Sequence, residues 1–391
     1  MKIDDKKSLK SPSIRFPEFT GEWEECVLGD YGKVVTGNTP PTKDIENYEN
    51  GTYLWASPAD LGTHKLISET KTKLSSKGFT KTRPLSKGSV LVTCIGSTIG
   101  KTGMATREMS TNQQINSIVV NENNDNEFVY YVVQSAFPHY LSSIAVQAVP
   151  IISKSSFELL PSKRPSLQEQ NKIGKFLSLL DERISTQHRL IEDLKKFKCA
   201  IVEKLYSEIQ GKEYSYRQLF EIINERNSRL EYSNVLSASQ EKGMVNREDL
   251  NLDIKFELSN INTYKIVREG DYVIHLRSFQ GGFAFSNMVG VCSPAYTIMR
   301  PKKLLEYGYL SYYFTSRKFI KSLIIVTYGI RDGRSINVDE WLDMKNIIPS
   351  KEQQQHILRT IRGFENKIEV EEMYASCLSK QKQYLLRQMF I

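Results

Sequence analysis

The sequence repeats itself, and this repeat constrains the fold more than any other feature. The segment 165–207 aligns without a gap on 349–391, 184 positions later (349 − 165). Both copies begin with Pro-Ser and carry a glutamine at the same place, Gln170 and Gln354. An internal repeat of this kind predicts two copies of one structural unit.

Each copy carries apolar residues that alternate four and three positions apart, the heptad spacing that keeps a stripe along one face of a helix. A helix of about 37 residues would be roughly 55 Å long, which exceeds what a compact domain usually accommodates. We therefore expect two long helices that pair as a coiled coil, rather than an amphipathic helix packed on a globular core. The expected contact residues are Ile184, Gln187, Ile191, Leu194, Lys198, Ile201, Ile368, Glu371, Ala375, Leu378, Lys382 and Leu385.

The same two stripe positions are polar in both helices, and polar stripe residues often fix the register of a coiled coil. They favour an antiparallel pair in one register. In that register the facing residues are Lys198 with Glu371, Gln187 with Lys382, Ile191 with Leu378, and Ile201 with Ile368.

Shorter similarities precede each helix. The segments that align between the two halves are Trp23–Val35 with Tyr214–Ile223, Gly88-Ser-Val-Leu with Gly270-Asp-Tyr-Val, Phe128-Val-Tyr-Tyr with Leu310-Ser-Tyr-Tyr, and Phe157 with Trp341. Turn glycines before apolar runs predict strands, so each half combines strands and helices. The expected fold is α/β (α+β), with two similar globular domains separated by two long helices.

The boundaries follow from these patterns. We expect a flexible basic segment at 1–14, globular domains at 15–164 and 211–347, and long helices at 165–210 and 348–391.

The composition is that of a globular protein, with 40% hydrophobic and 25% charged residues among 391. No apolar run is long enough to span a bilayer, and the lysine-rich start lacks the apolar core of a secretory signal. We expect a cytoplasmic protein. The net charge of +8 and pI near 9.0 favour a polyanionic partner, although solvated lysines alone would give the same charge.

Cysteine and histidine patterns give no sign of a disulfide framework or a metal site. The cysteines are widely spread, and we expect reduced, mostly buried thiols at Cys26, Cys94, Cys199, Cys292 and Cys377. The histidines form no pair at metal-ligand spacing; they are His64, His139, His188, His275 and His356.

Two strings resemble catalytic or nucleotide-binding motifs but depart from them. Gly96-Ser-Thr-Ile-Gly-Lys-Thr102 has three residues between its glycines, one fewer than a phosphate-binding loop requires. We interpret it as a turn between two strands with Lys101 exposed. Asn38-Thr-Pro-Pro41 lacks the residue order of a DNA methyltransferase motif. The sequence therefore shows no catalytic motif, although a nucleophile arrangement built from distant residues stays open.

Polar loop residues remain as candidates for reading base edges. Asn112, Gln113, Gln114 and Asn116 cluster between apolar strands, and amide side chains pair bidentately with adenine, as arginine does with guanine. A polar turn and a solvated surface are the alternatives. The candidates are Lys33, Thr36, Asn38, Thr39, Lys43, Ser97, Thr98, Lys101, Asn112, Gln113, Gln114, Ser239, Gln240, Lys242, Arg277, Ser278, Gln280, Arg331 and Arg334.

Several strings occur in an order that resembles the specificity subunits of type I restriction–modification systems. They are the Trp23-Glu-Glu opening with Leu28-Gly-Asp, the Gly37-Asn-Thr-Pro-Pro41 loop, the Ser97-Thr-Ile-Gly-Lys-Thr-Gly103 turn, and Pro165-Ser-Leu-Gln-Glu-Gln170 before a long helix. The second half lacks the Gly-Lys turn and the Thr-Pro-Pro loop.

The resemblance implies that each globular domain is a target-recognition domain for one half of a bipartite DNA site, while the helices set the gap. It implies two methyltransferase subunits docked on the helices, and restriction subunits that act as an ATP-dependent translocase and nuclease. S-adenosylmethionine, ATP and Mg would belong to those partners, and this chain would hold no cofactor and catalyse nothing. For docking we select Glu169, Gln170, Arg183, Gln353, Gln354 and Lys367, with solvated charge as the alternative.

Two other functions compete with this interpretation. One is a self-sufficient DNA-modifying enzyme with an unrecognised motif, and the other is a coiled-coil scaffold without a nucleic-acid partner.

Overall fold

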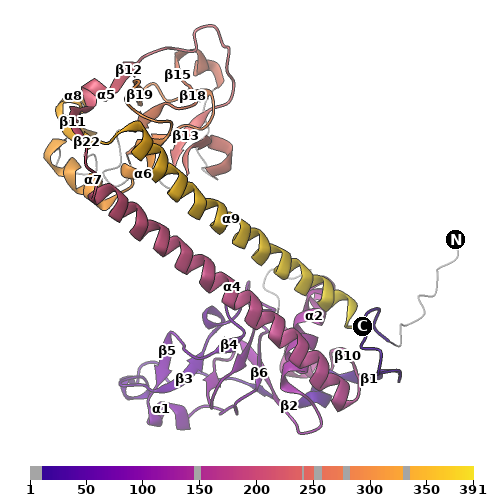
Figure 1. Cartoon of the computed structure of the whole chain (residues 1–391). Coiled ribbons are helices and arrows are strands. Elements are labelled where there is room, and N and C mark those ends of the chain that lie inside the picture. The colour runs from indigo at the N-terminus through magenta and orange to yellow at the C-terminus, as the bar shows by residue number, and fades with distance from the viewer. Residues whose placement is uncertain (1–10, 145–150, 240–241, 251–257, 276–281, 329–334) are drawn as a thin grey trace. The chain divides into compact units, whose positions relative to one another are not determined.

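The structure is a computed structural model that describes residues 11–144, 151–239, 242–250, 258–275, 282–328 and 335–391 (Figure 1). It divides into two compact units: unit 1 consists of Met1–His188 with Met373–Ile391, and unit 2 of Arg189–Glu372. Each unit therefore combines a globular part with a portion of both long helices.

Unit 1 is built around a five-stranded sheet with the strand order β2-β9-β6-β7-β4. Val90, Leu91 and Val92 of β6 are fully buried, because this central strand is covered on both faces. The elements are β1 Glu24–Val27, η1 Leu28–Tyr31, β2 Gly32–Thr36, η2 Ile45–Asn47, β3 Tyr53–Ala56, η3 Pro58–Asp60, β4 Leu66–Ile67, β5 Thr72–Leu74, α1 Ser76–Thr80, β6 Val90–Thr93, β7 Thr102–Ala105, β8 Ser110–Thr111, β9 Ile115–Val120, α2 Asn126–Ile144, α3 Lys154–Glu158, β10 Pro161–Arg164 and the start of α4 Leu167–Ser207.

Unit 2 is built around a four-stranded sheet with the order β12-β19-β16-β17. Its elements are β11 Lys212–Ser215, α5 Tyr216–Leu219, β12 Phe220–Ile223, β13 Leu236–Ser239, β14 Gly243–Asn246, η4 Arg247–Leu250, η5 Leu258–Thr263, β15 Lys265–Val267, β16 Tyr272–Ile274, β17 Phe283–Phe285, β18 Gly290–Cys292, β19 Thr297–Pro301, α6 Tyr309–Tyr313, α7 Arg317–Ser322, η6 Leu323–Val326, β20 Thr327–Tyr328, β21 Ser335–Ile336, α8 Val338–Asp343, β22 Lys345–Ile348 and most of α9 Lys351–Gln388.

Four strands of the unit 1 sheet, β2-β9-β6-β7, have the same order as the four strands of the unit 2 sheet. In each unit the strand that enters the sheet (β2 or β12) pairs with the last strand (β9 or β19), and a hairpin (β6–β7 or β16–β17) completes the order. A short antiparallel pair, β1 with β10 or β11 with β22, precedes each long helix. Gly88 and Gly270 both have positive φ, 84° and 90°, ahead of β6 and β16. The turn glycines are therefore equivalent, as the sequence predicts.

The alignment of Phe128-Val-Tyr-Tyr with Leu310-Ser-Tyr-Tyr is wrong by one position. Tyr131 donates to Asp181 at 2.7 Å, and the residue that makes this bond in unit 2 is Tyr312, which donates to Glu365 at 2.6 Å. Tyr131 thus corresponds to Tyr312, not to Tyr313. The error arose because adjacent tyrosines in both halves allow either alignment.

The long helices run antiparallel in each unit. In unit 2, Lys195 pairs with Glu372 and Lys198 with Glu365. In unit 1, Asp181 pairs with Lys382, and Arg183 donates to Tyr374. The twelve expected stripe residues are all buried or half-buried. Packing along one apolar stripe thus accounts for helices of 41 and 38 residues.

The expected register is wrong. Lys198 pairs with Glu365 at 3.2 Å instead of Glu371, and Lys382 pairs with Asp181 at 2.6 Å instead of Gln187. Each partner is six positions from the expected one (371 − 365 and 187 − 181), close to one heptad. The lysines reach carboxylates beside the stripe, while Gln187 and Glu371 stay buried within it, at 8% exposure each.

The start of the described chain is folded onto unit 1. Ile14 donates its backbone N–H to Gln388 O at 2.9 Å, and Arg15 binds Glu169 through two side-chain hydrogen bonds. The expected flexible segment 1–14 therefore does not extend to Ile14, and residues 1–10 lie outside the described part of the chain.

Candidate nucleic-acid interface

The polar candidates of the first half gather at one edge of the five-stranded sheet. Because the strands are antiparallel, the edge at which β2 and β6 end is also the edge at which β7 and β9 begin. Three connecting segments meet there: the loop 37–41, the turn 96–101 and the loop 112–114. We call this set of segments the loop edge.

The loop 37–41 is held by hydrogen bonds to the loop 112–114 and the strands beside it. Asn38 N donates to Thr111 O at 2.9 Å, Thr39 donates to Gln113 at 2.5 Å, and Thr36 donates to Asn116 at 2.6 Å. A Cβ on Gly37 would lie 2.2 Å from Thr111 O, so only glycine permits this close approach. The polar side chains of the loop edge are thus positioned by the fold.

The neighbouring turn and loop carry further donors and acceptors. Asn112 donates to Gln114 at 3.0 Å, and Gln114 O accepts from Cys94 N at the end of β6. Gln113 and Lys101 are exposed, as is Ser97, while Thr98 is half-buried. The string Gly96–Thr102 is therefore a turn between β6 and β7 with Lys101 exposed, as interpreted from the sequence.

Arg83 contacts the loop edge and was missed in the sequence. Its guanidinium donates to Thr36 O at 2.7 Å and its backbone N–H to Asn38 Oδ1 at 3.1 Å, while the side chain stays exposed. Lys81 is exposed beside it and binds Asp44 at 3.0 Å. The signal that could have found them is the basic stretch at Lys77, Lys81, Arg83 and Lys87.

Two candidates of unit 1 lie away from these contacts. Lys33 is exposed within β2, opposite Val119 and three residues before the strand ends. Lys43 is exposed beyond the loop 37–41. Neither makes a contact with the loop edge that would position it for base recognition.

The same edge in unit 2 is formed by other residues. Arg277, Ser278, Gln280, Arg331 and Arg334, together with Gln240, lie outside the described residues. His275 and Tyr296 lie there with ring centroids 6.0 Å apart, at the end of β16 and just before β19. Lys265 donates to Tyr296 O at 2.8 Å, and its pKa is lowered, chiefly by burial. Arg226 is exposed at the bridge to Lys265.

Ser239 and Lys242 lie at the turn of the β13–β14 hairpin, where Lys242 N donates to Ser239 Oγ at 3.3 Å. Lys242 is exposed and lines a cavity beside β17 and α6. The structure therefore places this lysine next to the long helices of unit 2 and not among the residues at the loop edge.

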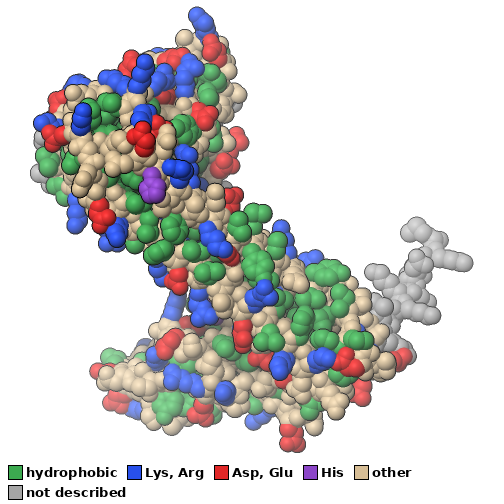
Figure 2. Space-filling model, viewed as in Figure 1, with side chains coloured by type: hydrophobic (Ala, Val, Ile, Leu, Met, Phe, Trp, Pro, Cys, Tyr) green, Lys and Arg blue, Asp and Glu red, His purple; other side chains and the backbone are tan. Residues whose placement is uncertain are grey.

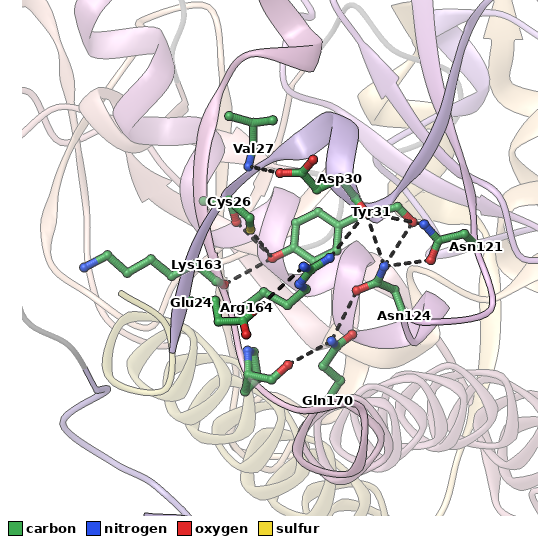
Figure 3. Close-up of polar contacts among 12 residues, drawn as sticks. Glu24, Cys26, Val27, Asp30, Tyr31, Asn121, Asn124, Lys163, Arg164 and Gln170 are labelled. Atoms are coloured by element: carbon green, nitrogen blue, oxygen red, sulfur yellow. Dashed lines mark hydrogen bonds and ion pairs between the residues drawn. The ribbon is translucent and has the colours of Figure 1, made fainter. Parts of the chain in front are cut away.

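A buried amide joins each globular part to the start of its long helix. Gln170 Nε2 donates to Asn124 Oδ1 at 3.2 Å (Figure 3) and to Pro165 O at 3.1 Å, and its Oε1 accepts from Asp125 N. Gln354 makes the equivalent bonds to Pro349 O and Glu306 N in unit 2. The repeated glutamines are therefore structural joints.

The prediction that six residues form a docking surface is wrong for three of them. Glu169, Gln170 and Gln354 are each only 1% exposed, so they cannot present an outward docking face. Glu169 is covered because Arg15 and Trp23 both donate to it. Arg183, Gln353 and Lys367 are exposed.

Exposed apolar side chains lie along the same helices. In unit 1, Leu179, Met373 and Tyr384 are 55%, 64% and 56% exposed, and hydrophobic side chains gather over this part of the helices in Figure 2. In unit 2, Phe197 and Val370 are 54% and 57% exposed. Exposed apolar groups along a paired-helix surface are typical of a site for another protein.

The described residues hold no group of three or more His, Cys, Asp or Glu side chains arranged for a metal ion. Among them there is also no helix with the length and apolar character needed to cross a bilayer. All five cysteines are free thiols, but only Cys94 and Cys292 are buried. Cys199 and Cys377 are exposed on the long helices, so the expectation of mostly buried thiols is wrong.

Comparisons with known proteins point to one family. A family model described as the type I restriction modification DNA specificity domain matches residues 20–196. The MjaVIII specificity subunit of a type I restriction enzyme from Methanocaldococcus jannaschii is 23% identical over 95% of this chain and 92% of the relative. The MjaIX specificity subunit of the same organism is 27% identical over 48% of this chain, which spans 45% of that relative.

Solved structures share the fold. An S subunit of a type I restriction-modification system from M. genitalium superimposes with a TM-score of 0.54 at 14% identity, over 97% of this chain and 99% of that one. A chain from a study of assembly and conformational transition of the type I R-M system gives a TM-score of 0.61 at 14% identity, over 93% and 96%. Residues 20–196 therefore carry a type I restriction modification DNA specificity domain, and the chain as a whole is similar to specificity subunits of type I restriction enzymes.

Proposed function

We propose that this chain is the DNA-reading subunit of a type I restriction–modification complex, recognising a bipartite duplex target with one half-site for each unit, and that it catalyses no step itself. The observation that carries the proposal is the duplicated sheet: β2-β9-β6-β7 of unit 1 and β12-β19-β16-β17 of unit 2 have the same strand order, and in unit 1 polar segments gather where β2 and β6 end. Loops on a rigid sheet can differ in residue type while the scaffold stays constant, so two copies can read two different half-sites.

The loop edge of unit 1 has the chemistry that base reading requires. Gln113 and Gln114 offer amides suited to adenine, and Arg83 offers a guanidinium suited to guanine or to a backbone phosphate. Gln113 accepts from Thr39, Gln114 accepts from Asn112, and Arg83 donates to Thr36 O, so little conformational freedom is lost on binding. In unit 2 we assign the equivalent task to Arg226, His275 and Tyr296, with Arg277 and Gln280 as sequence-based candidates.

The catalytic steps belong to partners in this proposal. Two methyltransferase subunits dock on the long helices, where Arg183, Gln353 and Lys367 are exposed beside apolar side chains such as Met373. Restriction subunits that use ATP join them. S-adenosylmethionine, ATP and Mg are then held by the partners. Because genomic DNA is the substrate, we place the complex in the cytoplasm.

The test is to map methylated adenines in the DNA of cells that express this chain with its methyltransferase partners. We expect a single motif with two specified half-sites and an unspecified gap. Arg83→Ala should relax or weaken one half-site by about 1–3 kcal/mol of binding free energy and leave the other unchanged. Lys87→Ala, an exposed lysine of the same stretch, is the control.

The competing functions give different results in the same system. A self-sufficient enzyme would transfer a labelled methyl group to DNA when the purified chain is incubated with S-adenosylmethionine alone. A scaffold without a nucleic-acid partner would show no sequence preference in a binding selection. Either outcome would refute the proposal.

A further inference from the structure

Unit 2 contains a cavity of about 560 Å³ beside β17, α6 and the two long helices. Among the described residues, its lining carries three cations, Lys198, Lys242 and Arg362, and one carboxylate, Glu365. Tyr312, Ser311 and Asn287 add polar groups, and Phe285 with Tyr307 forms an aromatic wall, their ring centroids 5.1 Å apart. The volume lies within the range of small-molecule sites.

The equivalent place in unit 1 is closed by a lysine. Lys65 donates to Tyr131 at 3.1 Å and to Ser178 at 3.0 Å, and it forms an ion pair with Glu127. Asp181 accepts a hydrogen bond from Tyr131 and forms an ion pair with Lys382. Two cations thus face two carboxylates, and the charges cancel.

The internal repeat shows which substitutions open the cavity. Tyr131, Asp181 and Lys382 are retained as Tyr312, Glu365 and Lys198, which make the same tyrosine-to-carboxylate bond and ion pair. Glu127 is replaced by Gly308, and Ser178 by Arg362 (178 + 184). One substitution removes a carboxylate and the other adds a guanidinium, so the described residues that line the cavity have a net charge of +2 (three cations minus one carboxylate).

Lys242 in unit 2 corresponds in its place to Lys65 in unit 1. It precedes Gly243, whose added Cβ would lie 2.4 Å from Phe285 O, so its segment runs against β17. In unit 1, Lys65 O accepts from Met104 N of β7, the strand equivalent to β17. Each lysine therefore comes from the segment that runs beside β7 in unit 1 or β17 in unit 2. Lys242 differs because it is exposed, whereas the Lys65 side chain is 12% exposed.

We propose that this cavity is a binding site for a nucleotide phosphate, held by Arg362 and Lys242 beside the Lys198–Glu365 pair. A phosphate dianion matches the excess charge of the lining, and a guanidinium binds phosphate oxygens through two parallel hydrogen bonds. Arg362 is exposed; it donates to Tyr307 O at 3.3 Å and also contacts the Tyr312 hydroxyl. Both partners are neutral groups, and a guanidinium with five N–H donors keeps donors for a ligand. The aromatic wall suits the base or sugar attached to such a phosphate.

The phosphate can come from a free nucleotide or from the backbone of a DNA strand. Full-length chain is titrated calorimetrically with a thymidine mononucleotide, with inorganic phosphate, and with duplex DNA at several salt concentrations. Arg362→Ser restores the unit 1 residue, and Arg359→Ser is the control, because it removes the same charge one turn away, outside the cavity. Both side chains are exposed, so equal melting temperatures will show that both variants are folded.

We expect Arg362→Ser to weaken binding about tenfold and Arg359→Ser less than about twofold. Weaker binding of the mononucleotide and of inorganic phosphate identifies a free nucleotide as the source. If only duplex binding weakens, with a salt slope lower by about one, the source is the DNA backbone. Equal behaviour of the two variants with all three probes would overturn the proposal, as would a loss confined to docking of a protein partner. Mononucleotide binding does not depend on sequence-specific reading of DNA, so the two proposals can fail separately.

Discussion

Two glycines on the long helices have opposite surroundings. A Cβ on Gly174 would lie 2.3 Å from Asp125 Oδ1 and 2.9 Å from Phe128 N, where α4 passes the start of α2. A Cβ on Gly363 of α9 would meet nothing within 4 Å. The first glycine is required by packing, and the second only weakens its helix.

The two alanine variants should therefore change stability in opposite directions. Gly174→Ala should destabilise the chain by about 1–3 kcal/mol because the backbone of α2 has to shift. Gly363→Ala should stabilise it by about 0.5–1 kcal/mol, since alanine loses less conformational entropy in a helix. Urea denaturation of the full chain measures both, and shifts of the same sign would contradict this account.

The buried joint at Gln170 gives a second test. Gln170→Ala would remove the hydrogen-bond partner of the Asp125 backbone N–H and the donor to Asn124 Oδ1, at a cost of about 1–3 kcal/mol. Asn171→Ala removes an exposed amide from the next position and should change stability by less than about 0.5 kcal/mol. Thermal melting compares the two, and equal losses would mean that the joint has no special role.

Thiol reactivity should separate the cysteines. Burial disfavours the thiolate and raises the pKa of Cys94 and of Cys292 to about 12, so both stay protonated from pH 7 to 9. Cys199 and Cys377 are exposed. Alkylation of the native chain followed by peptide mass spectrometry should label these two first and reach Cys94 and Cys292 only after unfolding. Early labelling of Cys94 would show that β6 is not buried.

At the level of the helices, the repeat duplicates an ion pair. Asp181–Lys382 and Glu365–Lys198 are the same pair in the two halves, since 181 + 184 is 365 and 198 + 184 is 382. The side chains of Asp181 and Lys382 are 19% and 16% exposed, so solvent screens this pair less than a surface ion pair.

Charge reversal tests this register against the one that the sequence favours. Lys198→Glu should destabilise the chain, and adding Glu365→Lys should recover about 1 kcal/mol through the restored pair. Adding Glu371→Lys instead should recover nothing, because Glu371 pairs with Lys367 in its own helix. Denaturation of the single and double variants gives both coupling energies. A larger coupling energy for Lys198 with Glu371 than with Glu365 would support the register expected from the sequence.

For the whole molecule, the duplicated architecture predicts two independent readers. Replacing residues 15–164 with the equivalent domain of a family member should change one half-site and leave the other as it was. The reason is that every described contact of the loop edge lies within unit 1. Mapping of methylated adenines reports both half-sites at once, and loss of both would count against independent reading.

Much of the architecture could be predicted from the chain alone. The gapless repeat and the heptad spacing predict two long helices in a chain of two similar halves, because periodicity is a local property that one sequence displays directly. Gly88 and Gly270 identify equivalent strands, β6 and β16, from the sequence alone. A backbone with positive φ favours glycine whatever surrounds it, so this preference is also a local property.

The register of the helices, the buried glutamines, Arg83 at the loop edge and the open cavity of unit 2 needed the three-dimensional structure. Each depends on which distant segments meet. Lys198 could face Glu371 within the stripe or Glu365 beside it, and Gln170 is a polar residue that is buried where it binds Asn124 and Pro165 O. A helical pattern shows which face of a helix is apolar. The geometry of side chains brought together from far apart in the chain decides which residues touch across that face, because packing and desolvation act only where the folded segments meet.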